Sequence, residues 1–185
     1  RGAVARSLFA RRGAAGCAPQ GPCGILGALS VLTAAYAAPL AAYHHRFPGL
    51  GGRSQTFVAA TDTIVRSFMG TFSALAKRYH IYMIGSADVA PFRQSRAPAD
   101  LASFSDPDLR PRPASVYLAS GTAVHNEAVM WAPHDVRSRG PDVLRNSVAS
   151  NQKVPLTPIE MFVGLAPGPS RADVVRGPHH RFVVD

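Results

Sequence analysis

A lysine and a glutamate stand seven residues apart in a short segment that also carries two prolines. The segment NQKVPLTPIE, residues 151–160, contains Lys153, Pro155, Pro158 and Glu160, and Lys153 is one of only two lysines in an arginine-rich chain. A lysine supplies a compact charge that can stabilise an oxyanion at an acyl-transfer centre, whereas a planar guanidinium would aim differently. The prolines restrict the backbone around the ammonium group. The segment predicts a catalytic lysine, with a solvated lysine and an exposed glutamate partner as the alternative.

A long helix is expected upstream of this segment. In residues 54–79 apolar side chains recur at spacings of three and four, which is typical of one helical stripe. The stripe consists of Ile64, Phe68, Phe72, Leu75 and Tyr79. Ser54 is the expected N-cap, and Lys77 and Arg78 suit the negative end of the helix dipole in the last turn.

Three strands are expected after the helix. IYMIGS, residues 81–86, predicts a buried strand closed by its glycine, and residues 88–113 predict an excursion loop. Residues 114–120 and 123–133 predict two strands of a hairpin, joined by a tight turn at SGT. A helix, a strand and a hairpin indicate an α/β or α+β layered domain.

Three of these segments resemble one protein family in their order along the chain. FSALAKRYHIYMIGS, VHNEAVMWAP and NQKVPLTPIE together resemble the carbon–nitrogen hydrolase (nitrilase/amidase) superfamily over about residues 68–168. The resemblance implies an α-β-β-α sandwich, incomplete here, that is homo-oligomeric in the complete protein. It also implies hydrolysis of a small-molecule nitrile or amide by a Glu-Lys-Cys triad without a cofactor. Lys153 matches the family lysine, and Glu160 matches a further glutamate that hydrogen-bonds near it.

The resemblance fails at the other two catalytic positions. The family base lies in a Phe-Pro-Glu context, whereas this chain reads RFPGLGG with Gly49 at that place. Glu127 is the other glutamate, and its mid-strand position predicts a solvent-facing or salt-bridged residue. No cysteine follows Cys23. We therefore expect either a piece of a larger hydrolase or a degenerate relative, and a chain that is inactive by itself.

The two cysteines carry no recognisable motif. Cys17 and Cys23 precede the predicted helix, and no C-x-x-C spacing is present, so neither a zinc ribbon nor a redox site is predicted. Their position predicts inert thiols in a loop. Free thiols are typical of a cytoplasmic protein, which is the expected localisation.

The net charge of +9 does not by itself indicate a nucleic-acid-binding protein. The arginines are dispersed singly or in pairs, and no basic run carries interleaved aromatic residues. The excess of arginine over lysine is instead typical of a GC-rich coding sequence. No nucleic-acid partner is expected.

Histidines occur in two adjacent pairs but do not predict a metal site. The candidates are His44, His45, His125, His134, His179 and His180. Adjacent histidines point apart on a strand and diverge on a helix, and no HExxH or His-Cys spacing is present. Trp131, at the end of a predicted strand, is expected to be a core or interface aromatic residue.

The N-terminal third raises the question of a membrane segment. Residues 24–43 carry no charge and follow several arginines, as in a signal peptide or a membrane span. They are rich in Ala and Gly and contain Pro39, so a buried or half-buried helix is expected and membrane association is not. We divide the chain into an irregular, Ala-Gly-rich segment (1–53) and a partial hydrolase domain (54–185). A non-catalytic binding or scaffolding module, membrane-associated through 24–43, is the alternative function.

Overall fold

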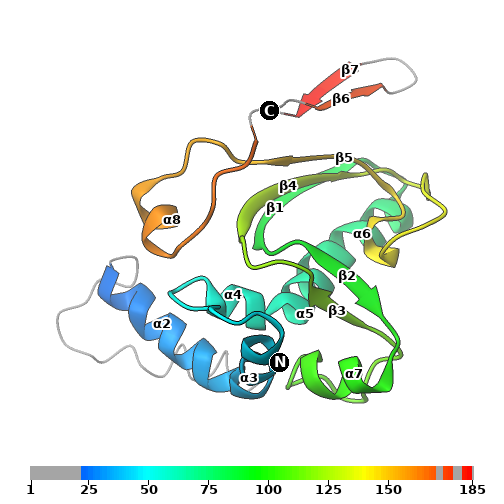
Figure 1. The fold of residues 1–185 in the computed structure, drawn as a ribbon. Coiled ribbons are helices and arrows are strands. Elements are labelled where there is room, and N and C mark those ends of the chain that lie inside the picture. Colours follow the sequence, from blue (N-terminus) through cyan, green and yellow to red (C-terminus); the bar gives the residue numbers. More distant parts are fainter. Residues whose placement is uncertain (1–21, 170–172, 177–180, 185) are drawn as a thin grey trace.

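The computed structural model describes residues 22–169, 173–176 and 181–184, which form a mixed α+β fold (Figure 1). The helices are α2 (Pro22–Ala35), α3 (Ala37–Arg46), α4 (Gln55–Ala59), α5 (Thr61–Ile64), the π-helical η1 (Val65–Met69), α6 (Gly70–Tyr79), α7 (Pro98–Phe104), the 3-10 helix η2 (Asp142–Leu144) and α8 (Pro158–Phe162). The strands are β1 (Met83–Val89), β2 (Phe92–Ser95), β3 (Val116–Ala119), β4 (His125–Trp131), β5 (Ser147–Gln152), β6 (Asp173–Arg176) and β7 (Arg181–Val184). The predicted α+β class is confirmed.

The strands form antiparallel sheets of order β1-β4-β5 and β2-β3, together with a β6-β7 hairpin. The predicted hairpin of 114–120 and 123–133 is therefore wrong, because β3 pairs with β2 and β4 lies between β1 and β5. The predicted loop 88–113 is also wrong, since it contains β2 and α7. The strand β3 pairs with β2, and after Ala119 the chain passes from this sheet to the three-stranded sheet that contains β4.

The strand β1 differs from the buried strand that was predicted. It begins at Met83, and Ile84 is 57% exposed. Gly85 does not close the strand but lies inside it. A Cβ atom at Gly85 would come within 2.6 Å of Phe72 and 2.9 Å of Phe68. Glycine therefore permits the close approach of β1 to η1 and α6.

The predicted helix 54–79 is present as four helical elements that follow one another, α4, α5, η1 and α6. The fully buried residues are not those of the predicted stripe, because the buried stripe lies one position further along the chain. They include Val58, Val65, Met69 and Ala76, whereas Tyr79 is 58% exposed. Ser54 occupies the N-cap position of α4, as predicted, but its backbone is helical and its side chain makes no capping hydrogen bond. Lys77 and Arg78 lie in the last turn of α6, as predicted.

The segment before residue 54 is helical where the structure describes it. The helices α2 and α3 meet at a bend of 81°, and Tyr36 and Tyr43 are buried in a core shared with α4 and β3. This confirms the half-buried Ala-rich helix. Cys23 lies in α2, so the loop reading is wrong for it, while Cys17 lies outside the described residues. No single helix in the described part of the chain has the length and apolar composition to cross a membrane, although the bent pair passes that test jointly.

Candidate functional site

The three-stranded sheet aligns three polar residues at one end. Asp88 of β1 lies opposite Asn126 of β4, and the Lys153 N–H donates to the Asn126 carbonyl at 2.9 Å, one residue beyond β5. Alternate residues of a strand point to opposite faces. Gly85 faces η1 and α6, so Asp88, Asn126 and Lys153 share the other face.

Lys153 and Glu160 meet at this end of the sheet. The Lys153 Nζ lies 2.9 Å from both the Oε1 and the Oε2 of Glu160. Glu160 is only 9% exposed, and the Lys153 side chain is 36% exposed. The ammonium group is thus held by a buried carboxylate while part of its side chain reaches solvent.

The start of α8 fixes the position of the Glu160 carboxylate. Thr157 is the N-cap of α8, and its N–H and hydroxyl donate to the Glu160 Oε2 at 2.7 and 2.8 Å. Pro158 occupies the first turn, where its missing N–H costs no hydrogen bond. This reciprocal cap positions Glu160 independently of the lysine.

Asn126 joins the ion pair to a second carboxylate. Its Nδ2 donates to the Asp88 Oδ1 at 3.0 Å and to the Glu160 Oε1 at 3.5 Å. We refer to Asp88, Asn126, Lys153, Thr157 and Glu160 as the Lys153 cluster. The sequence motifs did not assign a role to Asp88 or Asn126. The antiparallel register of β1 and β4 was the signal that could have found them.

The two carboxyl groups of the cluster have shifted proton affinities of opposite sign. The hydrogen bond from Lys153, helped by the Thr157 N–H, lowers the pKa of Glu160. Burial raises the pKa of Asp88, against the opposing hydrogen bond from Asn126. One carboxylate thus stays ionised and holds the ammonium group, while the other is protonated more easily. Carboxyl groups separated in this way are suited to acid–base chemistry.

The ammonium group retains the capacity to bind a substrate oxygen. An ammonium has three N–H donors, and the structure assigns two contacts with Glu160 in the described part of the chain. A third donor directed at a carbonyl oxygen would stabilise negative charge as it develops there.

The other candidates for the missing base lie apart from the cluster. Glu127 projects from the opposite face of β4, where burial raises its pKa and Gln152 and Ser150 hydrogen-bond to it. Glu127 is half-buried, so it faces solvent only in part. Gly49 has a φ of +92°, in the left-handed region. That turn favours glycine over a glutamate.

The histidines do not form a metal site in the described part of the chain. No group of three His, Cys, Asp or Glu residues suited to an ion is found there. His44 and His45 are exposed at the end of α3, and the His125 Nδ1 lies 3.0 Å from the Ala166 carbonyl oxygen. His179 and His180 lie outside the described residues. Trp131 is a core residue, as predicted, and its Nε1 donates to the Val143 carbonyl.

Comparison of the chain with protein-family models, with curated proteins and with solved structures finds no match. A function must therefore be argued from the Lys153 cluster and from the order of the sequence motifs.

Proposed function

We propose that this chain is the lysine-bearing part of a carbon–nitrogen hydrolase that acts on nitriles or carboxamides and not on peptide bonds. The observation that carries the proposal is the Lys153 ammonium group, held 2.9 Å from both oxygens of the buried Glu160 at the end of a sheet. The motif resemblance implies this pairing. A structural cap alone would not require a lysine at this point.

The arrangement of helices and sheet in layers supports the same proposal. In Figure 1 the sheet β1-β4-β5 has α6 on one side. Its other face bears the Lys153 cluster and the exposed Ile84. In an α-β-β-α sandwich a second sheet would cover this face. We propose that the chain supplies one α-β half of such a sandwich.

In the proposed reaction the residues of this chain stabilise the developing negative charge and transfer a proton to the leaving group. With a carboxamide substrate, Lys153 stabilises the oxyanion formed when a cysteine thiolate attacks the carbonyl carbon, and Glu160 positions Lys153. Asp88 is the carboxyl group of the cluster whose raised pKa suits proton transfer to the departing ammonia. Water then cleaves the thioester. No cysteine follows Cys23, so the described residues near Lys153 do not provide the nucleophile.

The test is ammonia release from a panel of carboxamides and nitriles, with trapping of the thioester by hydroxylamine. We expect no release by the purified chain, and release with hydroxamate formation by the protein translated from the complete reading frame. Ammonia release by the chain alone would contradict the statement that the residues near Lys153 do not provide the nucleophile. A complete protein that forms neither ammonia nor hydroxamate would contradict the proposal.

A non-catalytic binding or scaffolding module is the second candidate. The reciprocal cap between Thr157 and Glu160 favours it, because this cap stabilises α8 whether or not a substrate is present. Membrane association through 24–43 receives no support from the packing of α2 and α3, since Leu29, Tyr36 and Tyr43 are buried in the core.

A further inference from the structure

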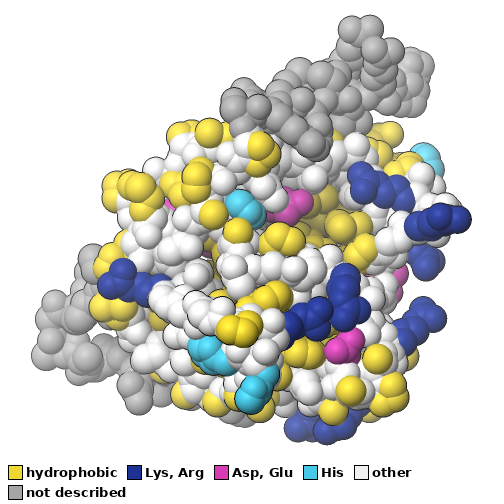
Figure 2. Space-filling model, viewed as in Figure 1, with side chains coloured by type: hydrophobic (Ala, Val, Ile, Leu, Met, Phe, Trp, Pro, Cys, Tyr) yellow, Lys and Arg dark blue, Asp and Glu magenta, His cyan; other side chains and the backbone are white. Residues whose placement is uncertain are grey.

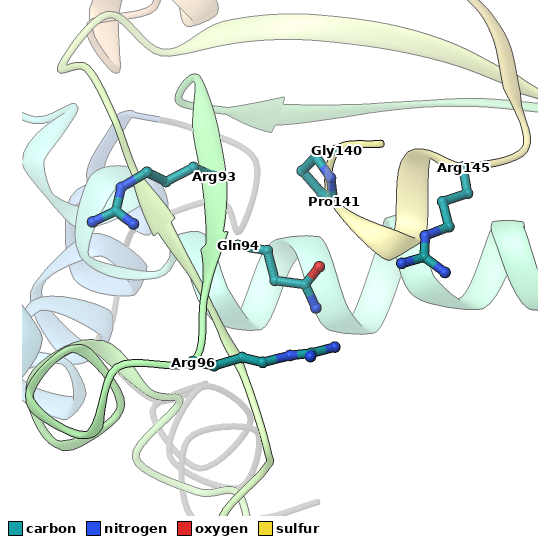
Figure 3. A pocket seen from close by; sticks show the side chains of 6 residues that line it. All are labelled: Arg93, Gln94, Arg96, Gly140, Pro141 and Arg145. Atoms are coloured by element: carbon teal, nitrogen blue, oxygen red, sulfur yellow. The ribbon is translucent and has the colours of Figure 1, made fainter. Parts of the chain in front are cut away.

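A second polar site lies between β2 and the segment 140–145. It is an open pocket of about 490 Å³. The lining residues are Arg93, Gln94, Arg96, Gly140, Pro141 and Arg145 (Figure 3). Half of them are arginines from two segments that are about fifty residues apart in the sequence, which is why the dispersed arginines gave no signal in the sequence.

The two walls of the pocket are held together by Gln94. Its Oε1 accepts from the Asp142 N–H at 3.1 Å, and its Nε2 donates to the Asp142 Oδ2 at 2.9 Å. The other carboxylate oxygen of Asp142 accepts from the Tyr117 hydroxyl. The pocket is therefore a preformed feature, because these bonds fix its width before any ligand arrives.

The guanidinium groups of Arg96 and Arg145 are free to bind a ligand. Both side chains are exposed, and no hydrogen bond or ion pair engages either guanidinium within the described residues. In Figure 3 the two side chains extend from opposite walls toward the same space. Arg93 has a 3.3 Å contact with Asp100 and is itself 46% exposed. Figure 2 shows several Lys and Arg side chains on the side of the molecule where β2 lies.

Asp142 adjoins this pocket through Gln94, but its charge is already engaged. Burial raises the pKa of Asp142, and the hydrogen bonds from Tyr117 and Gln94, with Arg145 nearby, outweigh this and lower it. Asp142 therefore stays ionised as part of the wall. The arginines still carry an excess of positive charge.

We propose that this pocket binds a phosphate-bearing small molecule through Arg96 and Arg145, with Arg93 at its rim. Guanidinium groups form paired hydrogen bonds with phosphate oxygens and stay charged at any physiological pH. A bound anion would also relieve the repulsion between two cations that share one space. The volume fits a small ligand. The lining has no aromatic side chain on which bases could stack, so nucleic acid is disfavoured.

The pocket is separate from the Lys153 cluster. Arg145 precedes β5 and Lys153 follows it, so the eight residue steps from one to the other span roughly 25 Å at about 3.3 Å per residue. Loss of one site therefore leaves the other in place, and the two proposals can fail independently.

The test is calorimetric titration of the purified chain with pyrophosphate, together with the variants Arg96→Gln and Arg145→Gln. Each substitution removes a charge-assisted contact and is expected to weaken binding about tenfold or more. Arg78→Gln is the matched control, because Arg78 is exposed at the end of α6 and loses the same charge. We expect the control to bind within about twofold of the unmodified chain.

A second measurement uses the unmodified chain and does not depend on the folding of any variant. Pyrophosphate should protect Arg96 and Arg145 from phenylglyoxal, read by mass spectrometry, while Arg78 stays reactive. Equal protection of all three, no binding up to about 10 mM, or equal weakening by all three substitutions would overturn the proposal. Tight binding of single-stranded DNA that pyrophosphate does not displace would overturn it in favour of a nucleic-acid surface.

Discussion

Glu160 combines two interactions that are often found apart. It completes the cap of α8 with Thr157, and its two carboxylate oxygens accept hydrogen bonds from the Lys153 ammonium group. Such a carboxylate is already anchored before the lysine approaches. The lysine therefore loses less conformational freedom than in a pair of two mobile side chains.

Removal of the lysine should have a moderate effect on stability. Lys153→Met leaves a mostly buried carboxylate with only the donors of Thr157 and the longer contact from Asn126. We expect the free energy of unfolding to fall by about 1 kcal/mol, since the Lys153 side chain is partly exposed. Urea unfolding measures the change. The control is Lys77→Met, whose partner Asp135 is 47% exposed and whose loss should change stability by less than about 0.5 kcal/mol. Equal losses in the two variants would contradict the anchored pair.

The cluster also predicts two opposite pH dependences of stability. The pKa of Glu160 lies below its usual 4.5, so its contribution is present above pH 4.5 and is lost as the pH falls through the lower folded value. The pKa of Asp88 lies above its usual 3.8, so its favourable contribution is present at low pH and is lost as the pH rises through the folded value.

Urea unfolding between pH 3 and pH 7 tests these signs. Glu160→Gln should be less stable than the unmodified chain at neutral pH, and the difference should shrink toward acidic pH. Asp88→Asn keeps the shape and should gain relative stability as the pH rises. Parallel pH profiles for both variants would show that the two carboxyl groups do not have opposite environments.

At the scale of elements, the contact between β1 and the helix beneath it depends on one glycine. Gly85→Ala would bring a Cβ atom within 3 Å of two phenylalanine rings. Phe72 is confined by Trp131, with ring centroids 5.5 Å apart. We expect a loss of about 1–3 kcal/mol in the free energy of unfolding, as for other overpacked cores.

Gly27→Ala is the control for this substitution. Gly27 lies inside α2 with nothing within 4 Å of an added Cβ, so alanine should be neutral or stabilising by roughly 0.5–1 kcal/mol. Thermal unfolding followed by circular dichroism separates the two outcomes. A Gly85→Ala variant as stable as Gly27→Ala would mean that the sheet and α6 are not in close contact.

The sequence was sufficient for the elements whose signals are local. Strands near 83–89 and 125–131 and the helix ending at Tyr79 could be predicted from short-range periodicity and composition. The choice of which strands pair depends instead on residues far apart in the sequence. The turn before β4 permits either a hairpin or a change of sheet, and the pattern does not show which strand becomes the neighbour. The helix likewise buries Val65, Met69 and Ala76 more fully than the predicted stripe one residue earlier. Both stripes have the helical period, so periodicity alone does not choose between them.

The candidate site was predictable to the same extent. Lys153 and Glu160 could be identified because the residues that join them are close in sequence. Asp88 and Asn126 depend on a pairing between strands that are 38 residues apart at that point. The arginine pocket depends on β2, which was predicted to be part of a loop.

At the scale of the whole molecule, the N-terminal helices belong to the same core as the sheets. The Ala119 N–H of β3 donates to the Tyr43 hydroxyl of α3 at 2.7 Å, and burial raises the pKa of Tyr43 to about 12. Residues 22–46 are thus tied to the β2-β3 sheet and do not form a separate irregular segment.

Tyr43→Phe tests this integration. The substitution keeps the ring but leaves a buried N–H without its acceptor, so we expect a loss of about 1–3 kcal/mol in the free energy of unfolding. Tyr79→Phe is the control, because Tyr79 is 58% exposed and should change stability by less than about 0.5 kcal/mol. An unchanged free energy of unfolding for Tyr43→Phe, together with a separate unfolding transition for residues 22–46, would show that the helices are independent of the sheet.

The measurement that tests the central claim most directly is the initial rate of ammonia release by the protein from the complete reading frame, carrying either of two lysine substitutions. Lys153→Met should abolish release to at least about a hundredfold below the unmodified protein, as expected for the loss of an oxyanion-stabilising donor. Lys77→Met, at the other lysine of the chain, should leave the rate within about twofold. Equal rates for the two variants would contradict a catalytic role for Lys153.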